Sequence, residues 1–308
     1  MTHHTFKSKI LLLFATLFIG CQNPPNAQVE EYESSIDEVI PFELTDANNI
    51  SIKAVLNDKQ NIDLMFHTAV TSVSLTTETI EKNSVDLDQS GSVRSWGGES
   101  SARFGGGHKI QIGNLVWEDL LVTESKLSGQ KTGGKFGYNF FKDQIIKLDF
   151  EASTVHVHSV LPNIDDYEKF NIEFENEMMF VTGSLLVGSN QLVNRFLIHS
   201  GFGGAVLLDD EFVARHKLIE RLEAIGESEL KDSYGNVLKT KKLVLPAFSL
   251  GHAKLKNIPI SVFEGAIRNQ KMSVIGGDVL KRFHIVFDFR NSKLYLKPNS
   301  LFNSKFKS

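Results

Sequence analysis

Residues 63–70 read DLMFHTAV and residues 195–202 read RFLIHSGF, and the two stretches resemble each other position by position. In each, an apolar run ends in a histidine, His67 or His199, followed by a small hydroxyl residue and then by alanine or glycine. An apolar strand that ends in a polar side chain at a turn is a common way to present a functional group. The duplication therefore predicts two half-sites that face each other across a pseudo-twofold axis.

Further landmarks recur at a nearly constant offset, which indicates an internal repeat. The matching pairs are SWG at 95–97 with SYG at 233–235, IQIG at 110–113 with FSLG at 248–251, FGYNFFK at 136–142 with IGGDVLK at 275–281, and IKLDF at 146–150 with VFDF at 286–289. Two similar lobes of about 120 to 140 residues are the expected architecture.

Short apolar or alternating runs dominate both halves and predict strands. The clearest predicted strands are residues 39–44, 50–56, 62–66, 177–187 and 192–198. One helix is expected over residues 209–223, with Asp209 or Asp210 as its N-cap. The predicted fold class is all-β and mainly antiparallel, with a few short helices and two β-barrel lobes related by pseudo-twofold symmetry.

The composition is that of an ordinary globular protein. The chain has 308 residues, of which 41% are hydrophobic and 23% charged, and its formal net charge is −4. A slightly acidic chain without a basic stripe gives no electrostatic footprint for nucleic acid. We therefore expect no nucleic-acid partner, and we separately expect a monomer.

The N-terminus predicts export. A basic start precedes an apolar run over residues 10–19 that is too short to span a bilayer as a stable helix. The following LFIGC at 17–21 resembles a bacterial lipobox, in which the cysteine, here Cys21, becomes lipid-modified, although Phe18 and Ile19 are bulkier than usual. The alternatives are a plain secretory signal or an uncleaved anchor. We expect a lipoprotein anchored to the bacterial cell envelope, on its periplasmic or outer-surface side.

These patterns divide the chain into five segments. The expected segments are a signal peptide at 1–21, a flexible tether at 22–38, an N-terminal lobe at 39–161, a C-terminal lobe at 166–298 and a short frayed tail at 299–308. Because Cys21 is the only cysteine, no disulfide can stabilise the mature fold.

The order of motifs resembles the aspartic peptidase fold of retropepsins and pepsins. That order is an apolar strand, a catalytic turn, a hairpin flap with an aromatic residue, an apolar-apolar-Gly segment with a short helix, and two closing strands. The resemblance spans roughly residues 39–298, more closely in the C-terminal half than in the N-terminal half. Both halves in one chain resemble bacterial retropepsin-like proteins with two fused lobes.

The resemblance places the family's two catalytic aspartates at His67 and His199. It also implies that Thr68 and Ser200 hold the dyad by hydrogen bonds, and it finds Ala69 where the family usually has glycine. Two carboxylates at contact distance share a proton and activate a water. Imidazoles cannot reproduce this arrangement. We therefore expect no catalysis by the two-aspartate mechanism.

Three functions stay open at this stage. The first is binding of an extended peptide or unfolded protein segment in the cleft, with Trp96, Gly97, Tyr234 and Gly235 forming the flaps, unless these aromatic residues only pack their hairpins. The second is altered hydrolase chemistry at the histidine pair, with Zn²⁺ as a possible cofactor and Glu99 or Asp232 as a third ligand. The third is residual proteolysis.

Several other polar residues have predicted structural roles. His156 and His158 alternate along a strand, so we expect them on one solvated side. Asn139 and Asp278 hold equivalent positions and are expected to cap short helices. Asp149 and Asp288 recur on the closing strands, where we expect turn or surface positions.

Overall fold

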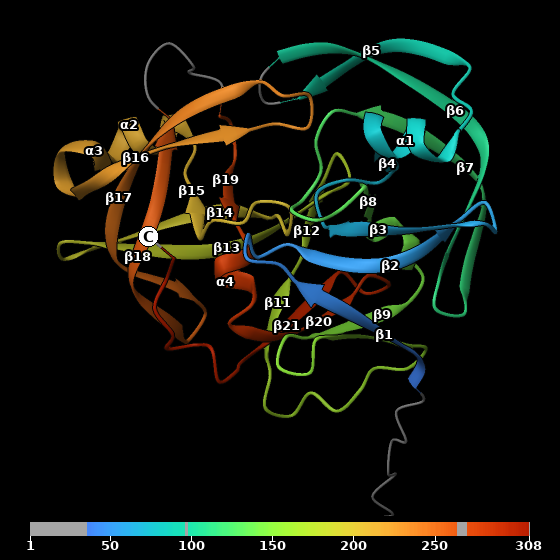
Figure 1. The fold of residues 1–308 in the computed structure, drawn as a ribbon. Coiled ribbons are helices and arrows are strands. Elements are labelled where there is room, and N and C mark those ends of the chain that lie inside the picture. The colour runs from blue at the N-terminus through green and yellow to red at the C-terminus, as the bar shows by residue number, and fades with distance from the viewer. Residues whose placement is uncertain (1–35, 96–97, 264–269, 308) are drawn as a thin grey trace, which may run out of the picture. The chain divides into compact units, whose positions relative to one another are not determined.

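A computed structural model of the protein describes residues 36–95, 98–263 and 270–307 (Figure 1). The predicted signal peptide with Cys21 and the flap residues Trp96 and Gly97 lie outside the described residues. The predicted all-β class is confirmed, since strands dominate and the helices are short. Among the described residues, no helix has the length and apolar character needed to cross a membrane.

The N-terminal half closes into a barrel of six strands in the order β2-β3-β8-β4-β7-β6, with β6 pairing back onto β2. Their bounds are β2 Ile50–Leu56, β3 Gln60–His67, β4 Val73–Thr76, β6 Gly98–Ile112, β7 Leu115–Ser125 and β8 Gly134–Gly137. The strand β5, Gln89–Ser95, extends this barrel by forming a hairpin with β6. We call this unit the N-terminal barrel.

The C-terminal half closes in the corresponding order, β13-β14-β19-β15-β18-β17, with β17 pairing back onto β13. Its strands are β13 Met178–Val187, β14 Asn190–Ile198, β15 Val206–Leu207, β17 Val237–Leu250, β18 Ala253–Phe263 and β19 Ser273–Ile275. The strand β16, Glu223–Lys231, forms a hairpin with β17, as β5 does with β6. We call this unit the C-terminal barrel.

Closing strands from both halves join in one shared sheet below the barrels (Figure 1). Its strands are β1 Ile36–Leu44, β9 Ile145–Asp149, β10 Thr154–His158, β11 Glu168–Asn171, β20 Phe283–Asp288 and β21 Lys293–Pro298. At its centre β9 pairs with β20, with Leu148 opposite Ile285 and Ile146 opposite Phe287. These two strands carry the sequences that match in the two halves, so they meet each other across the pseudo-twofold axis.

The strand pattern follows from which side chains are buried. Strand β2 alternates through the buried Ile50, Ile52, Ala54 and Leu56, as expected for a sheet with one face against a core. The ends of β3 and β14 are instead buried on both faces, which matches their continuous apolar runs. The strand β1 begins at Ile36, inside the segment predicted to be a flexible tether.

The predicted helix at 209–223 is confirmed at its start, but the structure divides it into two short helices that end at Arg221. Asp209 is the N-cap and accepts a hydrogen bond from the Phe212 N–H at 2.7 Å. The helix α2, Asp210–His216, then stops because Lys217 takes a left-handed conformation with φ 50°, and α3, Leu218–Arg221, follows. The other short helices are α1 Thr77–Asn83, η1 Tyr138–Phe141 and α4 Gly277–Leu280.

The tail was expected to fray, and this prediction was wrong for residues 299–307. The guanidinium of Arg282, which is fully buried, donates hydrogen bonds to the carbonyl oxygens of Leu301, Phe302 and Ser304. It also lies 3.6 Å from the centroid of the Phe306 ring. A buried cation is stable only when acceptors pair with it, so the tail carbonyl oxygens stabilise the buried Arg282 and the tail is an ordered part of the fold.

Three smaller predictions were also wrong. Asp278 does not cap α4: it lies in the first turn of that helix, is buried, and pairs with Lys281 at 2.8 Å and Arg282 at 3.3 Å. Asn139 likewise makes no cap hydrogen bond for η1. His158 is not solvated, since only 2% of it is exposed.

Asp149 and Asp288 do serve turns, as predicted. Asp149 accepts hydrogen bonds from two backbone N–H groups that follow it in the chain, and Asp288 accepts one from Asn291. Asp288 is nevertheless buried, so its predicted surface alternative was wrong.

Candidate functional site: a histidine pair between two barrels

Two parallel strand pairs place the histidines. His67 ends β3 beside Gly137 of β8, and Ile198, the residue before His199, ends β14 beside Ile275 of β19. Buried phenylalanines pack beside both strands, with the rings of Phe66 and Phe136 5.4 Å apart and those of Phe196 and Phe248 5.0 Å apart. Both histidines therefore stand where an apolar strand leaves its barrel and turns.

The two turns are joined by reciprocal hydrogen bonds. The Thr68 N–H donates to Ser200 Oγ, and the Ser200 N–H donates to Thr68 Oγ1, each at 3.0 Å. The hydroxyl of Thr68 donates to the Ile198 carbonyl and that of Ser200 to the Phe66 carbonyl, each at 2.7 Å. Thr68 and Ser200 are almost completely buried, so these bonds satisfy groups that water cannot reach.

This network brings the imidazoles of His67 and His199 together. Their ring centroids are 4.5 Å apart and the rings are tilted by 56°. The Ala69 N–H donates to His67 Nδ1 at 3.1 Å, and the Phe202 N–H donates to His199 Nδ1 at 2.9 Å. An Nδ1 that accepts a hydrogen bond carries no proton, so each neutral ring carries its proton on Nε2.

The surroundings favour the neutral form of both rings. Burial lowers the pKa of His67 well below its ordinary value, with further contributions from the charges of His199 and Lys135. Burial, followed by the charge of Lys135, lowers the pKa of His199 to about 4. Both imidazoles are therefore uncharged near neutral pH.

Lys135 is a site residue that the sequence analysis missed. It lies on β8 opposite Met65 of β3, is only 9% exposed, and its ammonium donates to Ser233 Oγ. Burial lowers its pKa to about 8, opposed by the carboxylate of Asp232. The signal available in the sequence was a lysine directly before the buried Phe136-Gly137 pair, which begins the segment that matches residues 275–281 of the second half.

The two turns differ at their third residue. A Cβ on Gly201 would lie 2.3 Å from His67 Nε2, so the ring of His67 occupies the space that any side chain there would need. On the other turn the methyl of Ala69 packs against an apolar cluster that includes Phe202. The first turn therefore has room for the alanine methyl, whereas the second turn has room only for glycine.

The tips of the two hairpins meet above this region. Ser95 at the end of β5 donates to Asp232 Oδ2 at 2.5 Å, and the N–H groups of Lys126 and Leu127 donate to the Ser233 carbonyl at 2.9 and 3.0 Å. Burial opposes ionisation of Asp232, but hydrogen bonds from Ser95 and Asn236 lower its pKa to about 2. The flap tip of the C-terminal barrel, residues 232–235, is therefore fastened to the N-terminal barrel.

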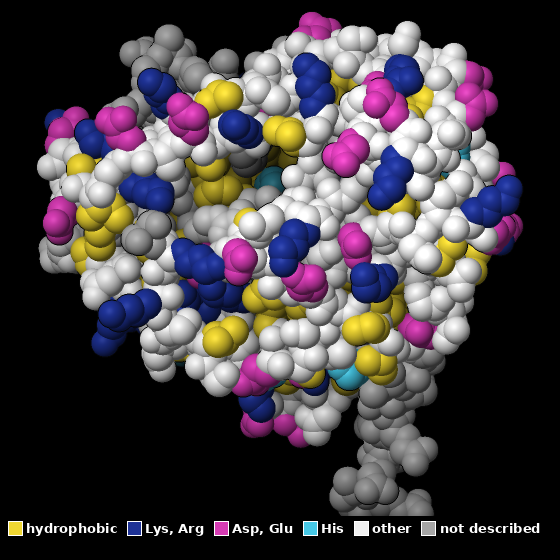
Figure 2. All heavy atoms as spheres, in the orientation of Figure 1, with side chains coloured by type: hydrophobic (Ala, Val, Ile, Leu, Met, Phe, Trp, Pro, Cys, Tyr) yellow, Lys and Arg dark blue, Asp and Glu magenta, His cyan; other side chains and the backbone are white. Residues whose placement is uncertain are grey.

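The two predicted flap residues of the C-terminal barrel, Tyr234 and Gly235, both lie in the flap tip but differ in burial. Tyr234 is partly buried in the flap tip, and Gly235 is exposed with φ 86°, a conformation that favours glycine. Figure 2 shows the surface hollowed beneath the β16–β17 hairpin, with hydrophobic side chains and a histidine visible inside.

The predicted zinc site at the histidine pair lacks a third ligand among the described residues. Glu99 instead accepts a hydrogen bond from Ser92 on its own hairpin, and Asp232 is engaged in the flap tip. Within the described ranges, the group of three or more potential metal ligands is Asp149, Glu151 and His284, in the shared sheet.

The comparison with protein families agrees with this architecture. A family model described as aspartyl protease matches residues 52–140, from β2 to η1, which include His67 and Lys135. The match supports an aspartyl protease-like family, and with the two barrels it confirms the aspartic-protease-like fold. A search of curated proteins finds no match.

Proposed function

We propose that this protein binds an extended peptide or protein segment between its two barrels and does not cut it by the two-aspartate mechanism. The observation that carries the proposal is the backbone N–H bond to Nδ1 of each histidine, at 3.1 Å for His67 and 2.9 Å for His199. These bonds hold neutral rings that offer Nε2–H donors. The peptidase mechanism instead requires two oxygen acceptors around a water.

The remaining features support a binding role. The reciprocal hydrogen bonds of Thr68 and Ser200 keep the two turns in fixed positions, and the hairpin tips lie over them. An extended peptide beneath such hairpins can pair through its backbone as an added strand. The Nε2–H donors and the ammonium of Lys135 favour a ligand that presents oxygen acceptors at the centre.

Binding can be tested with a library of fluorescent extended peptides and the purified protein. Tyr234→Ala and Trp96→Ala are expected to weaken binding at least tenfold if the flaps close over the ligand. Tyr167→Ala is the matched control, because Tyr167 contacts Lys297 on the shared sheet, away from the hairpins. Absence of binding to any peptide by the parent protein would refute the proposal.

Loss of the peptidase reaction has a separate test. We expect the parent protein to leave an unfolded protein substrate intact. The double variant His67→Asp with His199→Asp is expected to cleave it at acidic pH and to be inhibited by pepstatin. Cleavage by the parent that disappears in His67→Ala would show that the histidines themselves support hydrolysis.

Altered hydrolase chemistry at the histidine pair is the second candidate. It is favoured by the 4.5 Å separation of two neutral imidazoles, whose Nε2–H groups can donate hydrogen bonds to negative charge that develops on a substrate. The buried ammonium of Lys135 weighs against a cation at the same place. Zinc-dependent cleavage that is lost in His67→Ala would favour this candidate over simple binding.

We also propose that Cys21 is lipid-modified after export and anchors the protein to the cell envelope. The support is the sequence alone, a basic start, an apolar run and the LFIGC segment. Metabolic labelling with an alkyne fatty acid is expected to mark the parent protein and not Cys21→Ala. Equal labelling of both would overturn the proposal.

A further inference from the structure

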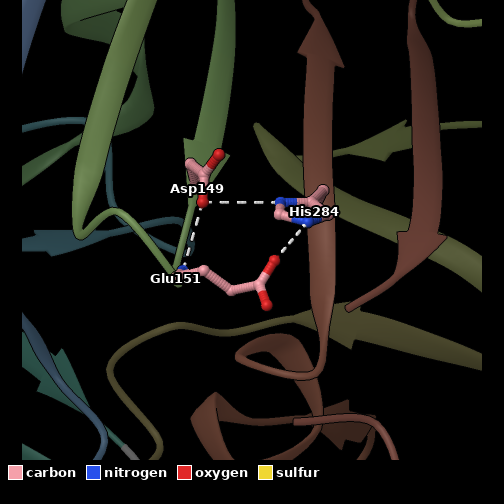
Figure 3. Close-up of side chains that lie close together, drawn as sticks. All are labelled: Asp149, Glu151 and His284. Atoms are coloured by element: carbon pink, nitrogen blue, oxygen red, sulfur yellow. Dashed lines mark hydrogen bonds and ion pairs between the residues drawn. The ribbon is translucent and has the colours of Figure 1, made fainter. Parts of the chain in front are cut away.

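A second group of polar side chains lies at the centre of the shared sheet, away from the histidine pair. Asp149 ends β9, Glu151 follows in the next turn, and His284 lies on β20, the strand that pairs with β9. In Figure 3 the three side chains point toward one another. The group therefore joins a strand of the N-terminal half to a strand of the C-terminal half.

One distance in this group matches that between metal ligands, and the other is an ion-pair contact on the opposite ring nitrogen. His284 Nδ1 lies 3.5 Å from Asp149 Oδ1, and His284 Nε2 lies 2.8 Å from Glu151 Oε2. One ligand atom from each residue can be chosen so that all three lie within 4.8 Å of one another. Around a tetrahedral zinc with bonds of about 2.0–2.1 Å, ligand atoms are separated by about 3.4 Å. The separation of Nδ1 and Oδ1 is close to that edge and long for a hydrogen bond.

An unsatisfied atom points into the group. His284 Nδ1 is buried and has no hydrogen-bond partner. A buried ring nitrogen without a partner is unfavourable unless a proton donor or a metal ion reaches it. Its nearest ionic neighbour is Asp149 Oδ1 at 3.5 Å, so a cation bound by this oxygen could also be bound by the unpaired nitrogen.

The positions of the two carboxylates are compatible with cation binding. Asp149 Oδ1 accepts the N–H groups of Glu151 and Ala152 at 3.1 and 3.0 Å, which fix its orientation. The Glu151 side chain is 40% exposed, so it can turn from Nε2 toward a shared ion.

We propose that Asp149, Glu151 and His284 bind one Zn²⁺ ion, with water as the fourth ligand, and that the ion fastens β9 to β20. This structural site is independent of the proposed peptide binding. The ammonium of Lys147, 3.7 Å from Asp149 Oδ2, opposes the ion electrostatically, so we expect a dissociation constant in the micromolar range.

The test is a calorimetric titration of the full-length, chelator-treated protein with Zn²⁺. We expect one ion per chain, binding at least tenfold weaker in His284→Gln and Asp149→Asn, and binding several-fold tighter in Lys147→Gln. Glu151→Gln changes an exposed turn without disturbing the sheet, so it still reports on the site if the strand variants fail to fold. Its zinc affinity is also expected to fall.

Two controls separate this site from other histidines. Glu168→Gln removes the carboxylate of the exposed His252–Glu168 pair, 2.8 Å apart, and is expected to leave zinc binding unchanged. The double variant His67→Asn with His199→Asn is also expected to retain the ion. Zinc should raise the melting temperature of the parent by a few degrees and leave that of Glu151→Gln nearly unchanged. No zinc binding by the parent would overturn the proposal. Zinc binding by Glu151→Gln and His284→Gln that is as tight as that of the parent would overturn it too.

Discussion

The turn after β3 and the turn after β14 make similar hydrogen bonds, although Nδ1 accepts from the second residue after His67 and from the third after His199, and they tolerate different residues. Each has a histidine whose Nδ1 accepts a backbone N–H, followed by a hydroxyl residue that bonds across to the other turn. Only the second turn needs glycine, because the His67 ring lies over Gly201 while the methyl of Ala69 points into an apolar cluster. The backbone is thus nearly symmetric and the side-chain packing is not.

The largest expected effect is that of Gly201→Ala, which tests whether the second turn alone requires glycine. The new methyl would lie 2.3 Å from His67 Nε2, so the ring or the turn must move. Overpacking of this kind lowers the free energy of unfolding by about 3 kcal/mol. The reciprocal variant Ala69→Gly is expected to lower it by about 1 kcal/mol or less. Urea unfolding at neutral pH measures both values, and equal losses would contradict the asymmetry.

The pH dependence of the free energy of unfolding tests whether the His199 ring is held neutral in its turn. The unfolded chain binds protons on histidine at about pH 6.5, whereas His199 in the folded protein has a pKa of about 4. The unfolded state therefore gains protons first, and the free energy of unfolding falls as the pH decreases from 6.5 to 4. The contribution of His199 is about 3 kcal/mol.

Unfolding measured across this pH range should show the slope in the parent and a smaller one in His199→Asn. Ser189→Ala is the control, since it changes an exposed turn position without a titratable group, and it should leave the slope unchanged. A parent protein whose unfolding free energy is flat between pH 6.5 and 4 would show that the rings are not held neutral.

Removing one hydroxyl tests the bonds that join the turns. Thr68→Val keeps the shape of the side chain but leaves the Ser200 N–H and the Ile198 carbonyl without their partner. Two buried groups left unsatisfied lower the free energy of unfolding by about 2 kcal/mol. Thr68→Ser keeps the hydroxyl and should stay close to the parent in the same urea titration. Similar losses in both variants would mean that the missing methyl, and not the hydrogen bonds, explains the effect.

The smallest effect is expected at the flap tip. Asp232→Asn removes the charge that Ser95 and Asn236 bind, so the tip should open more often. We expect a loss of about 1 kcal/mol from this contact. Faster hydrogen exchange at the N–H groups of Lys126 and Leu127, which bond to Ser233, would report the opening. Glu229→Gln, on an exposed position of the same hairpin, is the control and should not change these rates.

The strands of both barrels could be predicted, because buried apolar side chains repeat along them at the period of a strand. The pairing of His67 with His199 followed from the duplicated turn. The role of Lys135 could not be predicted, since its contact with Ser233 joins residues 98 positions apart. The prediction of a frayed tail was wrong for a similar reason. The burial of Arg282, which binds the tail carbonyl oxygens, is a property of the packed structure and is not visible in the local sequence.

The sequence by itself determined the all-β class and the two histidine turns, because these depend on local apolar patterns and on a repeat visible along the chain. The tertiary structure decided which nitrogen of each imidazole carries the proton, why glycine is needed at Gly201, and that Asp149, Glu151 and His284 meet. These features depend on backbone N–H directions and on distances between remote strands, and such distances exist only once the two halves pack together.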